Sequence, residues 1–140
     1  MKLINFYNQA VRFGRLADVR KAKSKIKSFP DSAILFGQPD LEVKKILVGI
    51  DIETPELLLA DRIRQKEGLD LVLAHHPEGK AYAGLYEVMR LQVDLLTQAG
   101  LAKPAATRLV EERMAQVQRG VLPQNHTRPV DAARLLKIPF

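Results

Sequence analysis

The chain has 140 residues, of which 46% are hydrophobic, which is enough for one ordinary globular domain with a buried core. Cysteine is absent, which excludes disulfides and thiolate metal sites, so any metal ion must be held by histidine, carboxylate or water. No stretch approaches the roughly 18 consecutive apolar residues of a membrane span, and the N-terminus lacks the pattern of a signal peptide, so we expect a cytoplasmic protein.

The net charge of +6 is concentrated near the N-terminus. Residues 1–28 hold eight basic side chains and one acidic side chain, whereas the remainder is nearly neutral. Such a segment can attract nucleic acid through counterion release. No aromatic residue is interleaved with the basic run at 20–27, so the pattern favours a solvated helix face over a surface on which bases stack.

The N-terminal third predicts one helix and an irregular segment. Residues 3–13 carry apolar side chains at helical spacing and predict an amphipathic helix that Gly14 interrupts. The lysine-rich stretch that follows is compatible with further helix as far as Phe29, where a proline stops it. Residues 32–40 fit either a brief edge strand or a packed loop.

The clearest unit of the sequence is a strand, a helix and a second strand. Residues 43–51 form a β-branched apolar run without alternation, which is typical of a strand covered on both faces. Thr54 is a candidate cap for the next helix, and Gly68 ends that helix. Residues 69–74 are a second strand of the same type, so the unit predicts two parallel strands with a crossover helix.

Three further helices are predicted in the second half of the chain. They cover residues 81–99, which Gly100 ends, residues 104–119, which Gly120 ends, and residues 129–137, which Thr127 precedes as a possible cap.

The predicted sheet has too few strands to be stable by itself, because independent stability usually takes three or more. A third strand from residues 32–37, a partner subunit, or a longer protein of which this chain is a fragment would each complete it, and we favour the fragment. We therefore expect an α/β fold with a mostly parallel sheet, of which this chain holds a part. We treat residues 1–140 as one partial domain with a basic helical segment over residues 1–30.

His75 and His76 form a candidate metal site at the end of the second strand. Neutral imidazole is a common ligand of zinc, iron and manganese. Parallel strands end at the same edge of a sheet, so Asp51 and Glu53 are expected to approach the histidines. Adjacent strand residues face opposite sides, but Pro77 ends the strand and allows the pair to splay and serve two neighbouring ions. The alternative is one buried histidine beside an exposed one.

The segments Lys45–Asp51 and Asp70–Pro77, with the helix between them, resemble the Nif-three-like family. These dinuclear-metal α/β proteins are often catalogued as GTP cyclohydrolase type two homologues, and the resemblance extends over residues 33–140. It implies that His75 and His76 are metal ligands, one to each of two divalent ions, which are Zn, Fe or Mn. It also implies that the α/β fold is a three-layer sandwich with a mostly parallel sheet, of which this chain is an incomplete N-terminal half. A ring-like homo-oligomer and a hydrolase-type activity are implied as well.

The other ligands of the family are not clearly present in this sequence. The family uses an aspartate from a His-Thr-x-x-Asp-type motif, and a histidine and a glutamate from near its C-terminus. His126-Thr127 with Asp131 is similar to the first motif, but the spacing is one residue too long and the segment looks helical. We therefore transfer no ligand role to these residues.

The sequence and the family resemblance indicate two possible functions. The first is a dinuclear metal-binding protein with metal-dependent hydrolase activity, either as a GTP cyclohydrolase homologue or as a phosphoesterase, acting on a small phosphate-containing or nucleotide-like substrate. Its metal site is incomplete in this chain, which alone is expected to be inactive. The alternative is a non-catalytic module that binds nucleic acid or a protein partner through the basic N-terminal segment.

Overall fold

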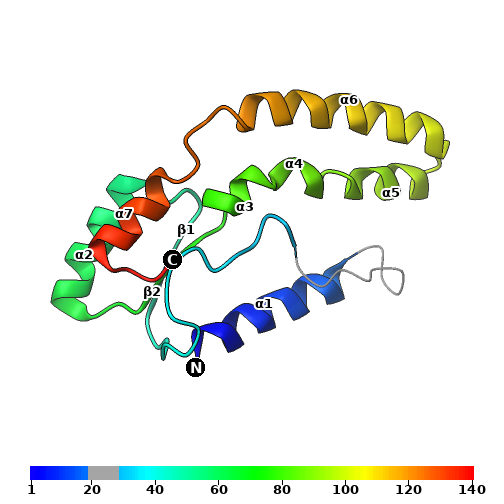
Figure 1. Cartoon of the computed structure of the whole chain (residues 1–140). Coiled ribbons are helices and arrows are strands. Elements are labelled where there is room, and N and C mark those ends of the chain that lie inside the picture. Colours follow the sequence, from blue (N-terminus) through cyan, green and yellow to red (C-terminus); the bar gives the residue numbers. More distant parts are fainter. Residues whose placement is uncertain (19–28) are drawn as a thin grey trace.

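The computed structural model describes residues 1–18 and 29–140 as a parallel two-stranded sheet with helices on both faces and a long helical arm (Figure 1). The elements in chain order are α1 (Leu3–Ala17), β1 (Ile46–Gly49), α2 (Thr54–Glu67), β2 (Leu71–Ala74), α3 (Gly79–Ala83), α4 (Leu85–Val88), α5 (Leu91–Gln98), α6 (Lys103–Val121) and α7 (Arg128–Leu136). The predicted helical continuation over the lysine-rich stretch lies outside the described residues.

The two strands pair in parallel, with a register that runs from Ile46 opposite Leu71 to Gly49 opposite Ala74. Because α2 connects them, the predicted crossover unit and the α/β fold class are confirmed. Each strand is shorter than the apolar run that predicted it.

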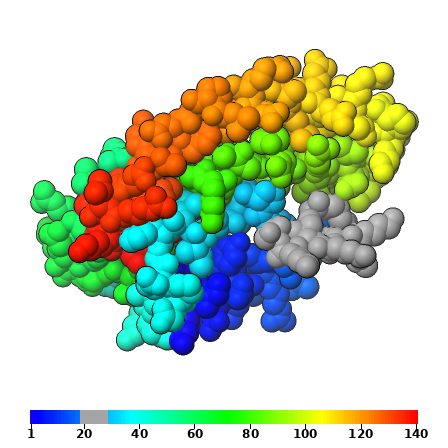
Figure 2. Space-filling view, viewed as in Figure 1, coloured from blue at the N-terminus to red at the C-terminus, as the bar shows by residue number. Residues whose placement is uncertain are grey.

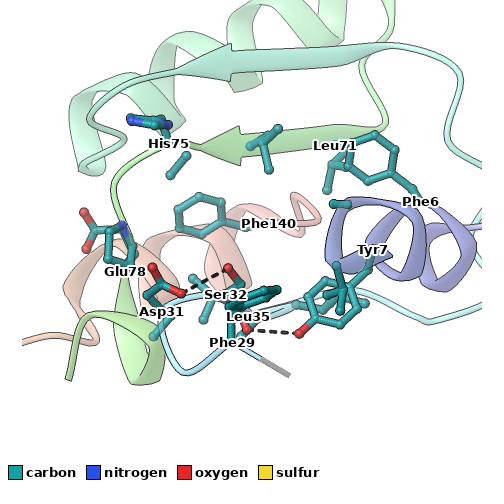
Figure 3. Close-up of a pocket in the computed structure, with 18 of the residues that line it drawn as sticks. Phe6, Tyr7, Phe29, Asp31, Ser32, Leu35, Leu71, His75, Glu78 and Phe140 are labelled. Carbon is teal, nitrogen blue, oxygen red and sulfur yellow. Dashed lines mark hydrogen bonds between the residues drawn. The ribbon is translucent and has the colours of Figure 1, made fainter. Parts of the chain in front are cut away.

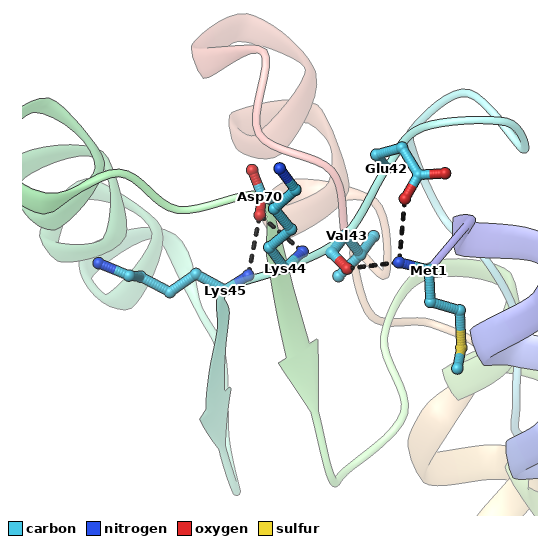
Figure 4. A network of polar contacts seen from close by, with 6 residues as sticks. All are labelled: Met1, Glu42, Val43, Lys44, Lys45 and Asp70. Carbon is cyan, nitrogen blue, oxygen red and sulfur yellow. Dashed lines mark hydrogen bonds and ion pairs between the residues drawn. The ribbon is translucent and has the colours of Figure 1, made fainter.

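Asp70 links the two segments just before β1 and β2 begin, through both its backbone and its side chain. Its backbone N–H donates to the carbonyl of Lys45 at 2.9 Å. Its Oδ2 accepts hydrogen bonds from the backbone N–H groups of Lys44 and Lys45, each at 2.8 Å (Figure 4). These backbone donors, Lys45 first and then Lys44, hold the pKa of Asp70 below its usual range. The side chain of Asp70 thus adds two hydrogen bonds to the backbone pairing at the start of the sheet.

One face of the sheet packs on α2 and α7 and forms the larger core. Leu47, Val72 and Ala74 point from the strands into this cluster, as expected for alternate strand residues. Its buried members are Ile52, Leu57, Ala60, Leu69, Val72, Val130, Ala133, Ile138 and Phe140.

The other face of the sheet is covered only at its beginning. Leu3 of α1 packs there with Val43 and Leu71, and the N-terminal ammonium pairs with Glu42 at 3.0 Å (Figure 4). Towards the carboxyl end of the first strand, the side chains of Val48 and Ile50 are more than half exposed, at 63% and 62%. The prediction that the strands are covered on both faces is therefore wrong at the carboxyl end of the strands, because α1 packs against their beginning.

Residues 32–40 form a packed loop and add no named strand to the sheet. Leu35 and Phe36 both donate backbone hydrogen bonds to the carbonyl of Phe140, and Phe140 donates one back to Phe36 at 2.8 Å. Pro139 in turn accepts a hydrogen bond from the backbone of Val72 at 2.9 Å. The loop and the last residues thus lie together beside β2.

The helical arm is an antiparallel layer in which α4 and α5 lie against α6 (Figure 2). The single helix predicted over residues 81–99 is wrong, since the segment divides into α3, α4 and α5. A side chain at Gly84 would meet the carbonyl oxygen of Pro30 at 2.9 Å, and the helix breaks at this close approach. Gly120 does not end its helix as predicted, because α6 continues through it.

The ends of the other helices differ from the predictions in three places. Gly14 lies inside α1 rather than interrupting it. The residue before α2 is Glu53 and not Thr54, and its backbone N–H donates to Glu56 Oε2 at 2.9 Å. Thr127 precedes α7 as predicted, but its hydroxyl donates to Asn125 rather than capping the helix. In the described ranges, no helix is long and apolar enough to cross a membrane.

Candidate metal centre

His75 and His76 follow directly after β2 and are held by backbone pairing with the other strand. The N–H of His75 donates to the carbonyl of Gly49 at 2.8 Å, and that of His76 donates to the carbonyl of Ile50 at 2.9 Å. The ring centroids are 5.3 Å apart and the ring planes are inclined by 39°. Both side chains are exposed, so the alternative of one buried histidine is wrong.

Asp51 reaches the same edge from the end of β1. Its Oδ1 lies 2.7 Å from Nδ1 of His76, although the two residues are 25 positions apart in the sequence. Parallel strands bring their carboxyl ends together at one edge, which is the reason for this approach. The predicted convergence of Asp51 with the histidine pair is confirmed.

Two further carboxyl groups gather beside this pair. Burial raises the pKa of Glu78 to about 7, and the negative charges of Glu53 and Asp51 add to the effect, while Arg128 opposes it. Glu53 forms an ion pair with Arg128, whose Nη2 lies 3.2 Å from Glu53 Oε2. This oxygen is buried and makes no hydrogen bond within the described part of the chain. The edge of the sheet therefore concentrates negative charge next to two imidazoles.

Gly79 places Glu78 at this edge. Its φ of 55° is left-handed, and a side chain there would meet Val130 of α7 at 2.7 Å. Its N–H donates to the carbonyl of His126 at 3.0 Å. Glu78 is not among the site residues predicted from the sequence; the local signal was the glutamate–glycine pair directly after the histidines and the proline.

A largely apolar pocket of about 360 Å³ opens beside the histidines. His75 and Glu78 lie at one end of it, whereas Phe6 and Tyr7 of α1 lie at the other, with Phe140 between them (Figure 3). The hydroxyl of Tyr7 donates to the backbone carbonyl of residue 32, which ties α1 to the wall of the pocket. The imidazoles thus face an open hollow and are not sealed under helices.

The segment that is similar to the His-Thr-x-x-Asp motif touches this edge through its backbone, since the carbonyl of His126 accepts from Gly79, but the side chains of His126 and Asp131 have other partners. His126 packs edge-on against Tyr82, with ring centroids 5.5 Å apart, and its buried Nδ1 has no hydrogen-bond partner among residues 1–18 and 29–140. Asp131 pairs with Arg134 on α7 at 3.2 Å. The structure gives no reason to assign a ligand role to either residue.

Comparison with known proteins relates this fold to a solved structure. No protein-family model matches the chain, and no curated protein does. The crystal structure of a NIF3 superfamily protein from Sphaerobacter thermophilus matches it with a TM-score of 0.73 and 33% sequence identity over 83% of this chain. The chain has a NIF3-like fold. The family resemblance predicted from the residues is thereby confirmed at the level of the fold, and the match supports NIF3 family membership.

The NIF3-like chain spans 41% of the length of that Sphaerobacter protein.

The donor set at the sheet edge fits a divalent ion in its chemistry. Imidazole nitrogen and carboxylate oxygen suit zinc, iron and manganese. A nearby cation would also oppose the burial and the charge repulsion that together raise the pKa of Glu78 to about 7. Among the residues that the structure describes, however, no three His, Cys, Asp or Glu side chains are grouped to hold an ion. The described residues thus offer suitable donors but do not group the three protein ligands of a typical catalytic zinc.

Proposed function

We propose that His75 and His76 bind divalent metal ions, one ion each, and that the NIF3-like protein uses them in a metal-dependent hydrolysis. The observation that carries this proposal is the pair of exposed imidazoles at the carboxyl edge of the parallel sheet, beside Asp51 and facing the pocket. Ligand sites of open α/β sheets lie outside this edge.

The chemistry of the neighbouring residues supports a hydrolytic role. Two ions close together polarise a phosphoryl or carbonyl oxygen and lower the pKa of bound water when they are present. Glu78 holds a proton up to about pH 7 and can exchange it near neutrality at its carboxyl group. Leu73 and Phe140 give the pocket an apolar wall beside the histidines.

A small phosphate-containing or nucleotide-like substrate is part of the same proposal. Lys80 is exposed five residues after His75 and can neutralise a phosphate beside the ions. We further propose, as the family resemblance implies, a homo-oligomer that acts in the cytoplasm.

Calorimetric titration with ZnCl₂ and with MnCl₂ tests the metal ligands. We expect His75→Ala and His76→Ala each to lower the affinity of the chain by at least about tenfold, because each removes one donor. His126→Ala is the matched control, since it deletes the remaining imidazole of the chain away from the sheet edge. Unchanged affinity in both variants of the pair, or an equal loss in His126→Ala, contradicts the proposal.

A further inference from the structure

We propose that Asp51 is a positioning residue that fixes the tautomer and orientation of His76. In this arrangement the carboxylate accepts a hydrogen bond from Nδ1–H, and Nε2 of His76 is left as the nitrogen that would be free to bind an ion. The inference deepens the proposed function and rests on it, because it assigns a role to a residue that is not itself a ligand.

The geometry of the contact carries the argument. Asp51 Oδ1 lies 2.7 Å from His76 Nδ1, the short separation of a charge-assisted hydrogen bond. The hydrogen bond from the His76 backbone to Ile50, the neighbour of Asp51, holds the two residues in register. The backbone pairing of the strands therefore brings the carboxylate to the ring. Both side chains are nevertheless largely exposed, Asp51 at 73% and His76 at 56%.

The chemistry of the two groups decides which nitrogen is free. An ionised carboxylate only accepts hydrogen bonds, so a ring bonded to it at 2.7 Å carries its proton on Nδ1. A neutral imidazole has one N–H, which leaves the lone pair on Nε2, at the part of the ring away from Asp51. Histidines that bind metals commonly donate their other N–H to a carboxylate in this way, and the contact sets both tautomer and ring orientation.

The two histidines differ in this respect. No residue in the described parts of the chain makes a hydrogen bond to the ring of His75, whereas His76 has Asp51. Of the two other carboxyl groups close to this edge, Glu53 is paired with Arg128, and Glu78 makes no hydrogen bond to either ring within the described parts of the chain. Asp51 thus orients His76, whereas no hydrogen bond within the described residues fixes the tautomer of His75.

Nitrogen-15 NMR of the imidazole rings tests the inference in the metal-free chain of 140 residues. We expect His76 to be the Nδ1–H tautomer in the wild type and a mixture of tautomers in Asp51→Ala, while His75 changes little. The affinity for Zn²⁺ should fall by about 10- to 100-fold in Asp51→Ala, the usual effect of losing such a partner. Asp51→Glu, which keeps the carboxylate, should recover part of both signals.

Asp40→Ala is the matched control, because it removes the same charge from an exposed loop residue. Circular dichroism establishes that each variant is folded. The inference is overturned if wild-type His76 is the Nε2–H tautomer, or if Asp51→Ala leaves the tautomer unchanged, even where zinc affinity falls. Unchanged zinc affinity in His76→Ala would instead refute the proposed metal site. The tautomer of His76 is measured without metal, so it tests the role of Asp51 independently of that site.

Discussion

At the scale of single residues, the fold changes the chemistry of Glu78 most clearly. The side chain is partly buried, and two other carboxyl groups face it from the loop between β1 and α2. Both effects penalise the ionised form, so the pKa rises from 4.5 to about 7. The residue therefore titrates near physiological pH without being a histidine.

This shift predicts that the metal-free chain loses stability as the pH rises towards 8. Because the folded pKa exceeds the unfolded one, the favourable contribution is complete below about pH 4.5 and disappears as the pH passes through about 7. Glu78→Gln, which mimics the protonated acid, should flatten this part of the profile and unfold at higher urea concentration at about pH 8. Solvent screening of the partly exposed group limits the difference to roughly 1 kcal/mol.

Urea unfolding with a chelator present, between about pH 5 and pH 8, measures this effect. Glu111→Gln is the control, since it removes an exposed carboxylate on α6. A wild-type profile that is as flat as that of Glu78→Gln contradicts the prediction.

The candidate site was predictable from the sequence only where strand geometry sufficed. Asp51 and His76 end two parallel strands, and the edge they share follows from topology alone. Glu78 gains its environment through the left-handed Gly79 and the contact of that glycine with Val130, which is 51 positions away in the sequence. The glutamate–glycine pair is visible in the sequence, but the distant contact that buries Glu78 is not, and so the role of the glutamate was missed.

At the scale of elements, tertiary contacts decide what each glycine does to its helix. The local cost of glycine in a helix is only about 1 kcal/mol, which packing readily outweighs. At Gly14 the helix continues, and the space of the missing side chain is filled by the ring of Phe29. At Gly84 the helix breaks against the backbone of Pro30. The sequence showed both glycines but neither neighbour, so their roles were not predictable.

Alanine substitutions at Gly84 and Gly120 should therefore act in opposite directions. Gly84→Ala places a side-chain carbon about 2.9 Å from a backbone oxygen and should destabilise the chain by about 1–3 kcal/mol. At Gly120, inside α6, a side chain meets nothing within 4 Å, and alanine should stabilise by up to about 1 kcal/mol. Urea unfolding of both variants beside the wild type measures the two changes. Equal effects of the same sign would show that the contact with Pro30 does not govern the break.

At the scale of the whole molecule, the candidate site lies where the sheet is least covered. Helices α2 and α7 cover one face fully, whereas α1 covers only the start of the other and leaves Val48 and Ile50 exposed. The apolar pattern predicted the strands and their parallel pairing because it depends on local sequence. It did not predict which half α1 would cover, because that depends on where a separate helix docks.

This arrangement predicts that the chain of 140 residues binds Zn²⁺ or Mn²⁺ only weakly and turns over little substrate. Within the described residues, two imidazoles face the pocket and no third donor joins them in a ligand group, so each ion keeps most of its water ligands. Competition with a chelator of known affinity measures the binding, and hydrolysis of GTP and of a phosphate monoester, with and without added metal, measures turnover. Two tightly held ions per chain, retained through gel filtration together with metal-dependent hydrolysis, would mean that this chain assembles a complete centre.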